Sequence, residues 1–84
     1  MNEMKKLIEL AVKRMETNMP LVVTVQGGAQ FAGVPVTHDE YLELATPAPS
    51  FEAQANKPMD LVQLLPYSNI VAVAFAKMKL NLTI

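Results

Sequence analysis

Residues 21–36 read LVVTVQGGAQFAGVPV, and this stretch decides the fold class of the 84-residue chain. Its first five residues are rich in β-branched side chains, which point alternately to opposite faces of an extended chain, and this is typical of a half-buried strand. The Gly-Gly pair at 27–28 predicts a tight hairpin turn, because glycine adopts positive φ without strain. A second strand is predicted over 30–36. Its interior Gly33, followed by Pro35, predicts a strong bend or the close approach of another backbone.

An amphipathic helix is predicted before this hairpin, over residues 2–17. Asn2 can cap its first free amides, while Asn18 and Pro20 end it, since proline cannot continue the hydrogen-bond ladder. Apolar residues recur there at three- and four-residue steps, which is the spacing of one helix face. These apolar positions are Met4, Leu7, Ile8, Ala11 and Met15.

Apolar and polar residues alternate again after a polar turn, and this pattern predicts three more strands. A proline-rich segment separates the first of these strands from the other two and predicts a loop. The predicted strands lie over 20–26, 30–36, 41–46, 59–65 and 70–84, with the loop over 47–58. We therefore expect one mainly β domain over 1–84. It should be a small, strongly bent, five-stranded antiparallel barrel with the N-terminal α-helix across one open end.

The composition favours association with further copies of the same chain. Hydrophobic residues make up 51% of the sequence and charged residues only 18%. A monomer of this size buries only about 63% of the surface of its unfolded chain, so its core is marginal. The segment Ile70–Ala76 is apolar on both faces of its predicted strand, and it is the natural candidate for a contact between subunits.

Several classes of function are disfavoured by the composition. Cysteine is absent and there is one histidine, which argues against disulfides, zinc centres and thiol catalysis. His38 stands beside Asp39, but no serine is placed to complete a triad, and we expect neither an enzyme nor a cofactor. Seven basic against eight acidic residues give a net charge of −1, without the global basic field of many duplex-DNA binders. We expect a cytoplasmic protein, because the start does not resemble a signal peptide and Ile70–Ala76 is too short to span a membrane.

Several residues also fall into a pattern that a known family shares. The apolar strand Leu21–Val25 precedes a turn glycine, Gly28, and the mid-strand Gly33, with Asp39 six residues further on. Asn69 stands directly before the last apolar strand. In these features the chain resembles the Sm-like family, which includes the LSm proteins and bacterial Hfq. The resemblance implies a barrel that assembles into a homo-oligomeric ring and binds single-stranded RNA, with U- or A-rich sequences as candidates.

Two departures from the family pattern leave an alternative open. Glu43 stands where the family carries an asparagine that reads uridine, and Pro66-Tyr67 replaces a basic residue and a glycine. Loss of those groups favours a protein-interaction scaffold that has kept the barrel but has lost RNA recognition.

The resemblance implies a nucleic-acid site at two turns of the chain. Its candidate residues are Asp39, Tyr41, Glu43, Tyr67, Ser68 and Asn69. Tyr41 is expected to stack on a base, or else to pack on the sheet with its hydroxyl in water. Glu43 could accept a hydrogen bond from uracil N3–H or an exocyclic amine, or it could be a solvated carboxylate or the partner of a lysine.

The other candidates have mainly positional roles in this interpretation. Asp39 is expected to orient its turn through hydrogen bonds, and Tyr67 to offer a second stacking face. Ser68 and Asn69 would line a central pore, with Asn69 also fixing its turn because it tolerates left-handed φ. We expect the basic residues of the helix to form either a basic rim that attracts RNA or a solvated face balanced by Glu3, Glu9 and Glu16. These basic residues are Lys5, Lys6, Lys13 and Arg14.

Overall fold

The computed structural model describes residues 3–47 and 59–77, and it has a mainly β fold with one N-terminal helix. Its elements are α1 (Glu3–Arg14), β1 (Leu21–Val25), β2 (Gln30–Thr37), β3 (Tyr41–Pro47), β4 (Asp60–Pro66), the single-turn 3-10 helix η1 (Tyr67–Asn69) and β5 (Ile70–Phe75). The predicted helix and the first four predicted strands are thus present with small shifts at their ends. The final strand, predicted over 70–84, ends at Phe75, and residues 76–77 after it are not in a strand. The predicted loop, apart from Pro47, which ends β3, and residues 78–84 lie outside the described residues.

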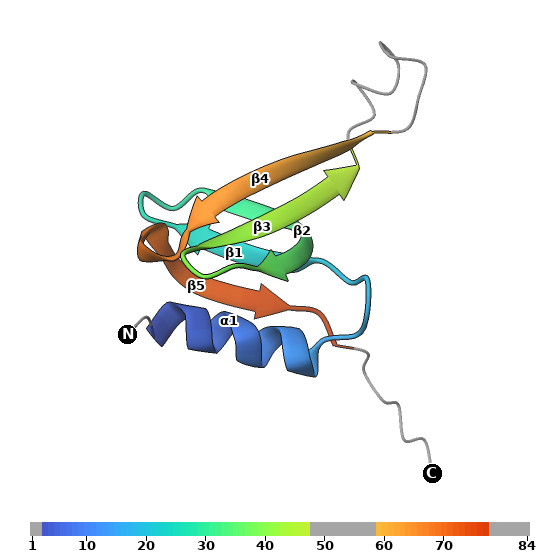
Figure 1. Cartoon of the computed structure of the whole chain (residues 1–84), viewed down its shortest axis with the longest axis horizontal. Helices are drawn as coiled ribbons and strands as arrows, with labels where there is room; N and C mark the ends of the chain where they lie inside the picture. Colours follow the sequence, from blue (N-terminus) through green and yellow to red (C-terminus); the bar gives the residue numbers. More distant parts are fainter. Residues whose placement is uncertain (1–2, 48–58, 78–84) are drawn as a thin grey trace.

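The five strands form one antiparallel sheet in the order β4-β3-β2-β1-β5 (Figure 1). The mainly β, five-stranded antiparallel expectation is therefore confirmed. In the described part of the chain the sheet is open, because β4 and β5 each pair with a neighbour on one side only. The closed barrel expected from the sequence is not formed by the hydrogen bonds of the described residues.

Strand β2 bends at Gly33 and changes its partner there. Its first half pairs with β1 up to Gly33, and its second half pairs with β3 from Val34 onward. A Cβ atom on Gly33 would lie 2.9 Å from the carbonyl oxygen and 3.0 Å from the backbone nitrogen of Ala45. Only glycine allows two backbones to approach this closely, and the prediction of a close approach at this residue is confirmed. Gly27 and Gly28 also have the predicted positive φ, of 95° and 96°.

Helix α1 packs along β5 and covers one side of the sheet (Figure 1). Ile8 and Ala11 point from the helix into a core whose other members come from the strands and η1. The buried members of this core are Ile8, Ala11, Leu21, Val23, Val25, Leu42, Leu44, Tyr67 and Ile70.

The helix ends at Arg14 rather than at the predicted residue 17. The amide of Met15 still donates to the carbonyl of Ala11, over 2.9 Å, but the chain then enters a turn closed by Met19 N–H and the carbonyl of Glu16. Asn18 has a φ of 65° in that turn, which no helical residue adopts. The helical pattern of side chains continues further than the helix itself, because apolar Met15 also packs against the core after the helix has ended.

We predict that Gly33→Ala destabilises the fold by about 1–3 kcal/mol, because the new methyl group overlaps backbone atoms of β3 that cannot move independently. Urea unfolding followed by circular dichroism measures this change. Ala32→Ser, at the neighbouring exposed position of β2, should change the free energy of unfolding by no more than about 0.5 kcal/mol. Equal stabilities for the two variants would contradict the role assigned to the close contact.

Candidate functional site

The turn between β2 and β3 brings two ring side chains together. His38 and Tyr41 flank the two turn residues, and the amide of His38 donates to the carbonyl of Tyr41 over 3.0 Å. Residues opposite each other in a hairpin share one face of the sheet. The rings of His38 and Tyr41 are accordingly stacked, with centroids 4.4 Å apart and an angle of 18° between their planes. Tyr41 remains 37% exposed, so part of its ring is open to a ligand.

A half-buried carboxylate lies beside this ring pair. Glu43 Oε1 is 3.1 Å from His38 Nε2, and an ionised carboxylate can only accept, so the imidazole N–H is the donor. The strand register places Val36 opposite Glu43 on one side and Leu64 opposite it on the other. These two apolar side chains are exposed, Leu64 by 60%. Glu43 is therefore held in one orientation within an apolar surface on the outer face of β2, β3 and β4.

Tyr67 supports the β2–β3 turn from the core side. Its hydroxyl donates to the carbonyl of His38 over 2.7 Å, and its amide donates to the carbonyl of Glu40 over 3.4 Å. The side chain is only 1% exposed and belongs to the core. Burial raises the pKa of the Tyr67 hydroxyl above its ordinary value of 10.0, although the bond to His38 opposes this, and the negative charges of Glu9 and Asp39 add to the rise. In the single chain Tyr67 thus supports the turn from the core, and its ring is not on the surface.

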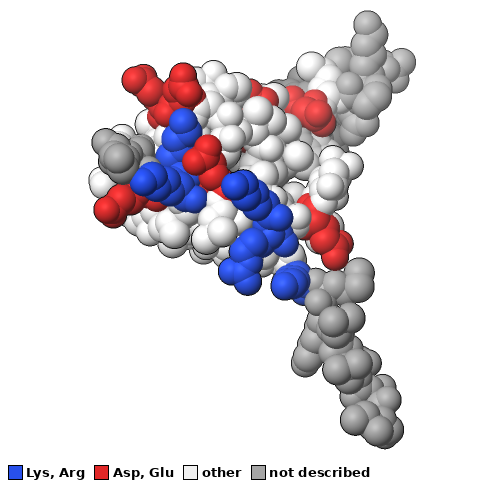
Figure 2. Space-filling model, turned by 60° about the horizontal axis from the view of Figure 1, so that its bottom comes forward, with Lys and Arg blue, Asp and Glu red and all other residues white. Residues whose placement is uncertain are grey.

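Asp39 connects the turn with the start of the helix. Its carboxylate Oδ1 lies 3.6 Å from Lys5 Nζ, while the Asp39 side chain itself is fully exposed. Such an exposed pair contributes little to stability, but it shows that the turn lies beside Lys5 in the first part of α1. Figure 2 shows positive side chains along the side of the molecule that α1 covers, with acidic side chains among them.

Ser68 and Asn69 lie in η1, away from the outer face that carries Glu43. Ser68 is exposed, and Asn69 accepts a hydrogen bond from the amide of Gln26 through its backbone carbonyl, over 2.9 Å. Among the described non-glycine residues only Asn18 has a positive φ, so Asn69 does not use the left-handed conformation expected for it. Asn69 ties its turn to the β1–β2 hairpin, but by its main chain rather than its side chain.

Of the six candidate residues, the structure therefore brings three together on or beside one turn: Asp39, Tyr41 and Glu43. Tyr67 joins them from the core side. A hollow of about 430 Å³ lies at this turn, lined by His38, Asp39, Glu40 and Tyr41. Its wall combines rings with carboxylates, which suits a ligand that has an aromatic face and hydrogen-bond donors.

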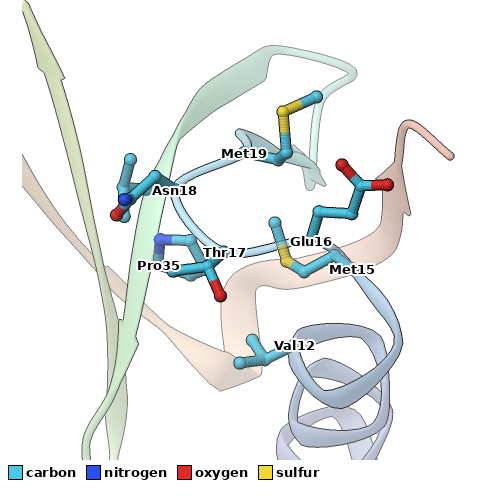
Figure 3. A pocket seen from close by; sticks show the side chains of 8 residues that line it. Val12, Met15, Glu16, Thr17, Asn18, Met19 and Pro35 are labelled. Carbon is cyan, nitrogen blue, oxygen red and sulfur yellow. The ribbon is translucent and has the colours of Figure 1, made fainter. Parts of the chain in front are cut away.

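A second hollow, of about 270 Å³, lies where the end of α1 and the following loop meet β2 (Figure 3). Val12 and Met15 contribute apolar walls on the helix side, and Val34 and Pro35 do so on the strand side. Glu16 is the charged residue among those that line it. None of the candidate residues from the sequence lies here, and the hollow offers no comparable combination of ring and hydrogen-bonding groups.

His38 and Glu40 line the hollow at the turn but were not among the candidate residues. His38 was left out because a lone histidine in a turn is usually just exposed. A usable signal was present in the sequence. If the turn at Asp39 and Glu40 has two residues, His38 and Tyr41 must stand opposite each other, and Glu43 follows Tyr41 on the same face by alternation.

The described ranges, 3–47 and 59–77, contain no group of three or more His, Cys, Asp or Glu residues that could hold a metal ion. Nor is any helix within them long and apolar enough to cross a membrane. Comparisons with protein-family models, curated proteins and solved structures find no match to this chain.

We predict that Tyr67→Phe destabilises the protein by about 1–2 kcal/mol, because the carbonyl of His38 loses its donor. The loss should be largest at neutral pH. The pKa of the Tyr67 hydroxyl is higher in the folded than in the unfolded state, so the protonated hydroxyl contributes to stability below pH 10. This contribution to the free energy of unfolding is lost as the pH rises through the raised pKa of Tyr67. Urea unfolding at neutral and strongly alkaline pH measures both effects.

The control for this prediction is Tyr41→Phe, which removes a hydroxyl from the exposed ring and leaves Tyr67 in place. This variant should keep the alkaline loss of stability that Tyr67→Phe reduces. If both variants show the same alkaline profile as the unaltered protein, the hydrogen bond from Tyr67 does not support the turn.

Proposed function

We propose that this chain is a homo-oligomeric, Sm-like ring protein that binds single-stranded RNA at the β2–β3 turn. The observation that carries the proposal is the stacked pair His38 and Tyr41 with the oriented carboxylate of Glu43 beside it. A flat ring with a hydrogen-bonding group next to it matches the two ways in which unpaired bases are recognised, stacking and contacts to the base edge. A cytoplasmic location remains a prediction from the sequence.

Assembly is supported by the two ends of the sheet. In the described chain, β4 and β5 expose backbone groups on their outer sides, and such edges pair readily with another strand. Val71 on β5 is 52% exposed, although its strand is apolar on both faces. Contact of β4 in one copy with β5 in the next is a heterologous interface, which closes into a ring when the rotation allows it.

Further apolar surface lies next to the β5 edge. A groove of about 320 Å³ runs between α1 and β5, with Leu7 and Leu10 on one wall and Val73 and Phe75 on the other. Both leucines are half exposed in the single chain. Surface of this kind supports burial against a neighbouring copy, which would supplement the small core of each chain.

The charge distribution supports RNA binding on the side where the turn meets α1. The described basic residues lie on α1 and at the end of β5, namely Lys5, Lys6, Lys13, Arg14 and Lys77. In a ring, each of these charges is repeated in every subunit, so the local positive potential exceeds what the net charge of −1 suggests. Phosphates along α1 and a base at the turn would then occupy neighbouring sites.

A protein-interaction scaffold is the second candidate, and one observation favours it. The turn carries three carboxylates, Asp39, Glu40 and Glu43, which repel phosphate and would suit a basic peptide. The exposed apolar residues of β4 next to the turn would add contact area for such a partner. Failure of RNA binding with an intact ring would favour this function.

For the assembly, we expect analytical ultracentrifugation at micromolar concentration to give a mass several times the 9.2 kDa of one chain. Val71→Lys should lower this mass, because a charged side chain on an edge strand opposes pairing. Val34→Lys, on the inner strand β2, makes the same chemical change away from the edges and should leave the mass unchanged. A folded, solitary 9.2 kDa particle would contradict the ring.

For RNA binding, we expect fluorescence anisotropy with oligo-U, oligo-A and mixed-sequence RNA to give a Kd below about 100 µM at low salt for at least one of them. Tyr41→Ala should weaken binding roughly 5- to 150-fold, the equivalent of about 1–3 kcal/mol for one stacked base. Tyr41→Phe keeps the ring and should retain most of the affinity. Absence of measurable binding to all these RNAs would overturn the RNA function and leave the fold untouched.

A further inference from the structure

We infer that the base selected at the β2–β3 turn is guanine, and that Glu43 is the residue that selects it. This inference rests on the proposed RNA-binding function and adds the identity of the base. It departs from the U- or A-rich preference that the resemblance implies, because the hydrogen-bonding group at this position is a carboxylate.

Glu43 offers a base hydrogen-bond acceptors only. An ionised carboxylate has two acceptor oxygens and no donor. His38 Nε2 donates to Oε1 over 3.1 Å and uses one of about four lone-pair positions. Further lone pairs on both oxygens remain for a ligand. The bond from His38 also limits rotation of the carboxylate, so that His38 acts as a positioning residue.

The four bases differ in the donors and acceptors on their Watson–Crick edges. Guanine presents two neighbouring donors, N1–H and the N2 amine, which match two carboxylate oxygens. Uracil N3–H lies between two carbonyl oxygens, and a carboxylate that accepts from N3–H brings its second oxygen against one of them. Adenine and cytosine each place a ring-nitrogen acceptor beside their amine, with the same conflict. Guanine is therefore the base whose Watson–Crick edge satisfies both oxygens.

The side chains opposite the carboxylate of Glu43 are apolar. Val36 and Leu64 stand opposite Glu43 on the two neighbouring strands, and both are exposed on the same outer face. Tyr41 is two residues from Glu43 along β3, about 7 Å at the rise of a strand, and lies on that face as well. A base placed beside the Tyr41 ring is thus within reach of Glu43. Apolar neighbours reduce competition from water and strengthen charge-assisted hydrogen bonds.

The test measures anisotropy with a U-rich RNA in which every third nucleotide is guanosine, adenosine, cytidine or uridine, a spacing that avoids guanine quadruplexes. The guanosine RNA should bind roughly 5- to 150-fold more tightly than the others, the range for a two-bond contact to one base. Replacing guanosine by inosine, which lacks the N2 amine, should remove most of this difference.

Two matched variants assign the preference to one side chain. Glu43→Gln replaces one acceptor by a donor, so the guanosine preference should disappear in favour of the other bases, each of which presents one donor beside one acceptor. Glu16→Gln makes the same change of charge at an exposed residue outside the β2–β3 turn and should keep the preference for guanosine. Circular dichroism and the sedimentation mass verify that both variants fold and assemble.

The possible results separate this inference from the proposed function. Binding to all four RNAs with equal affinity, or equal binding of the guanosine and inosine RNAs, overturns the selection of guanine and leaves RNA binding in place. The same holds if Glu16→Gln and Glu43→Gln change the preference alike. Absence of binding to any of the RNAs overturns the proposed function and the inference with it.

Discussion

The close approach of the β2 and β3 backbones at Gly33 is the constraint on which the arrangement of this protein depends. Because no Cβ stands between them, β2 can leave β1 at this residue and continue along β3. The bend separates the β1–β5 half of the sheet, which α1 covers, from the β3–β4 half (Figure 1). The two edge strands, β5 and β4, belong to different halves, and the outer face of β2, β3 and β4 carries exposed apolar residues. The bend at Gly33 thus lies between the half that α1 covers and the half that carries the candidate site.

Much of this fold can be predicted from the sequence because its strongest signals are local. The turn at 27–28 follows from the conformational freedom of glycine, and the close approach at Gly33 follows from its missing side chain. Alternation gives the first four strands within one residue at each end, but it continues past Phe75, where β5 ends. The end of α1 could not be predicted in the same way, since Met15 continues the apolar pattern after the helix has stopped. Whether the sheet closes depends on the distance between β4 and β5, which no local pattern specifies.

Part of the candidate site could likewise be predicted from the sequence, and part of it could not. Tyr41 and Glu43 share a face by simple alternation, so their proximity could be predicted, and His38 could have been added from the length of the turn. The burial of Tyr67 could not be predicted, because its hydroxyl meets the carbonyl of His38 across 29 residues of sequence. A tyrosine in place of the family's glycine suggested an exposed stacking face. The structure shows instead a side chain in the core that holds the turn at two points.

An acidic turn can still serve RNA if affinity and selectivity come from different groups. One of the three carboxylates, Asp39, lies beside Lys5, so the local negative field is weaker than the count of acids suggests, and Glu43 accepts a hydrogen bond from His38. The basic side chains of α1, multiplied by assembly, would supply the attraction to phosphate. Glu43 would then lower the affinity for every RNA because it repels phosphate. Hydrogen bonds to a base with two donors would restore part of the affinity for that base. In such a site a carboxylate would lower the affinity for all RNAs and increase the discrimination between guanine and the other bases. An amide at the same position would favour a different base and would repel phosphate less.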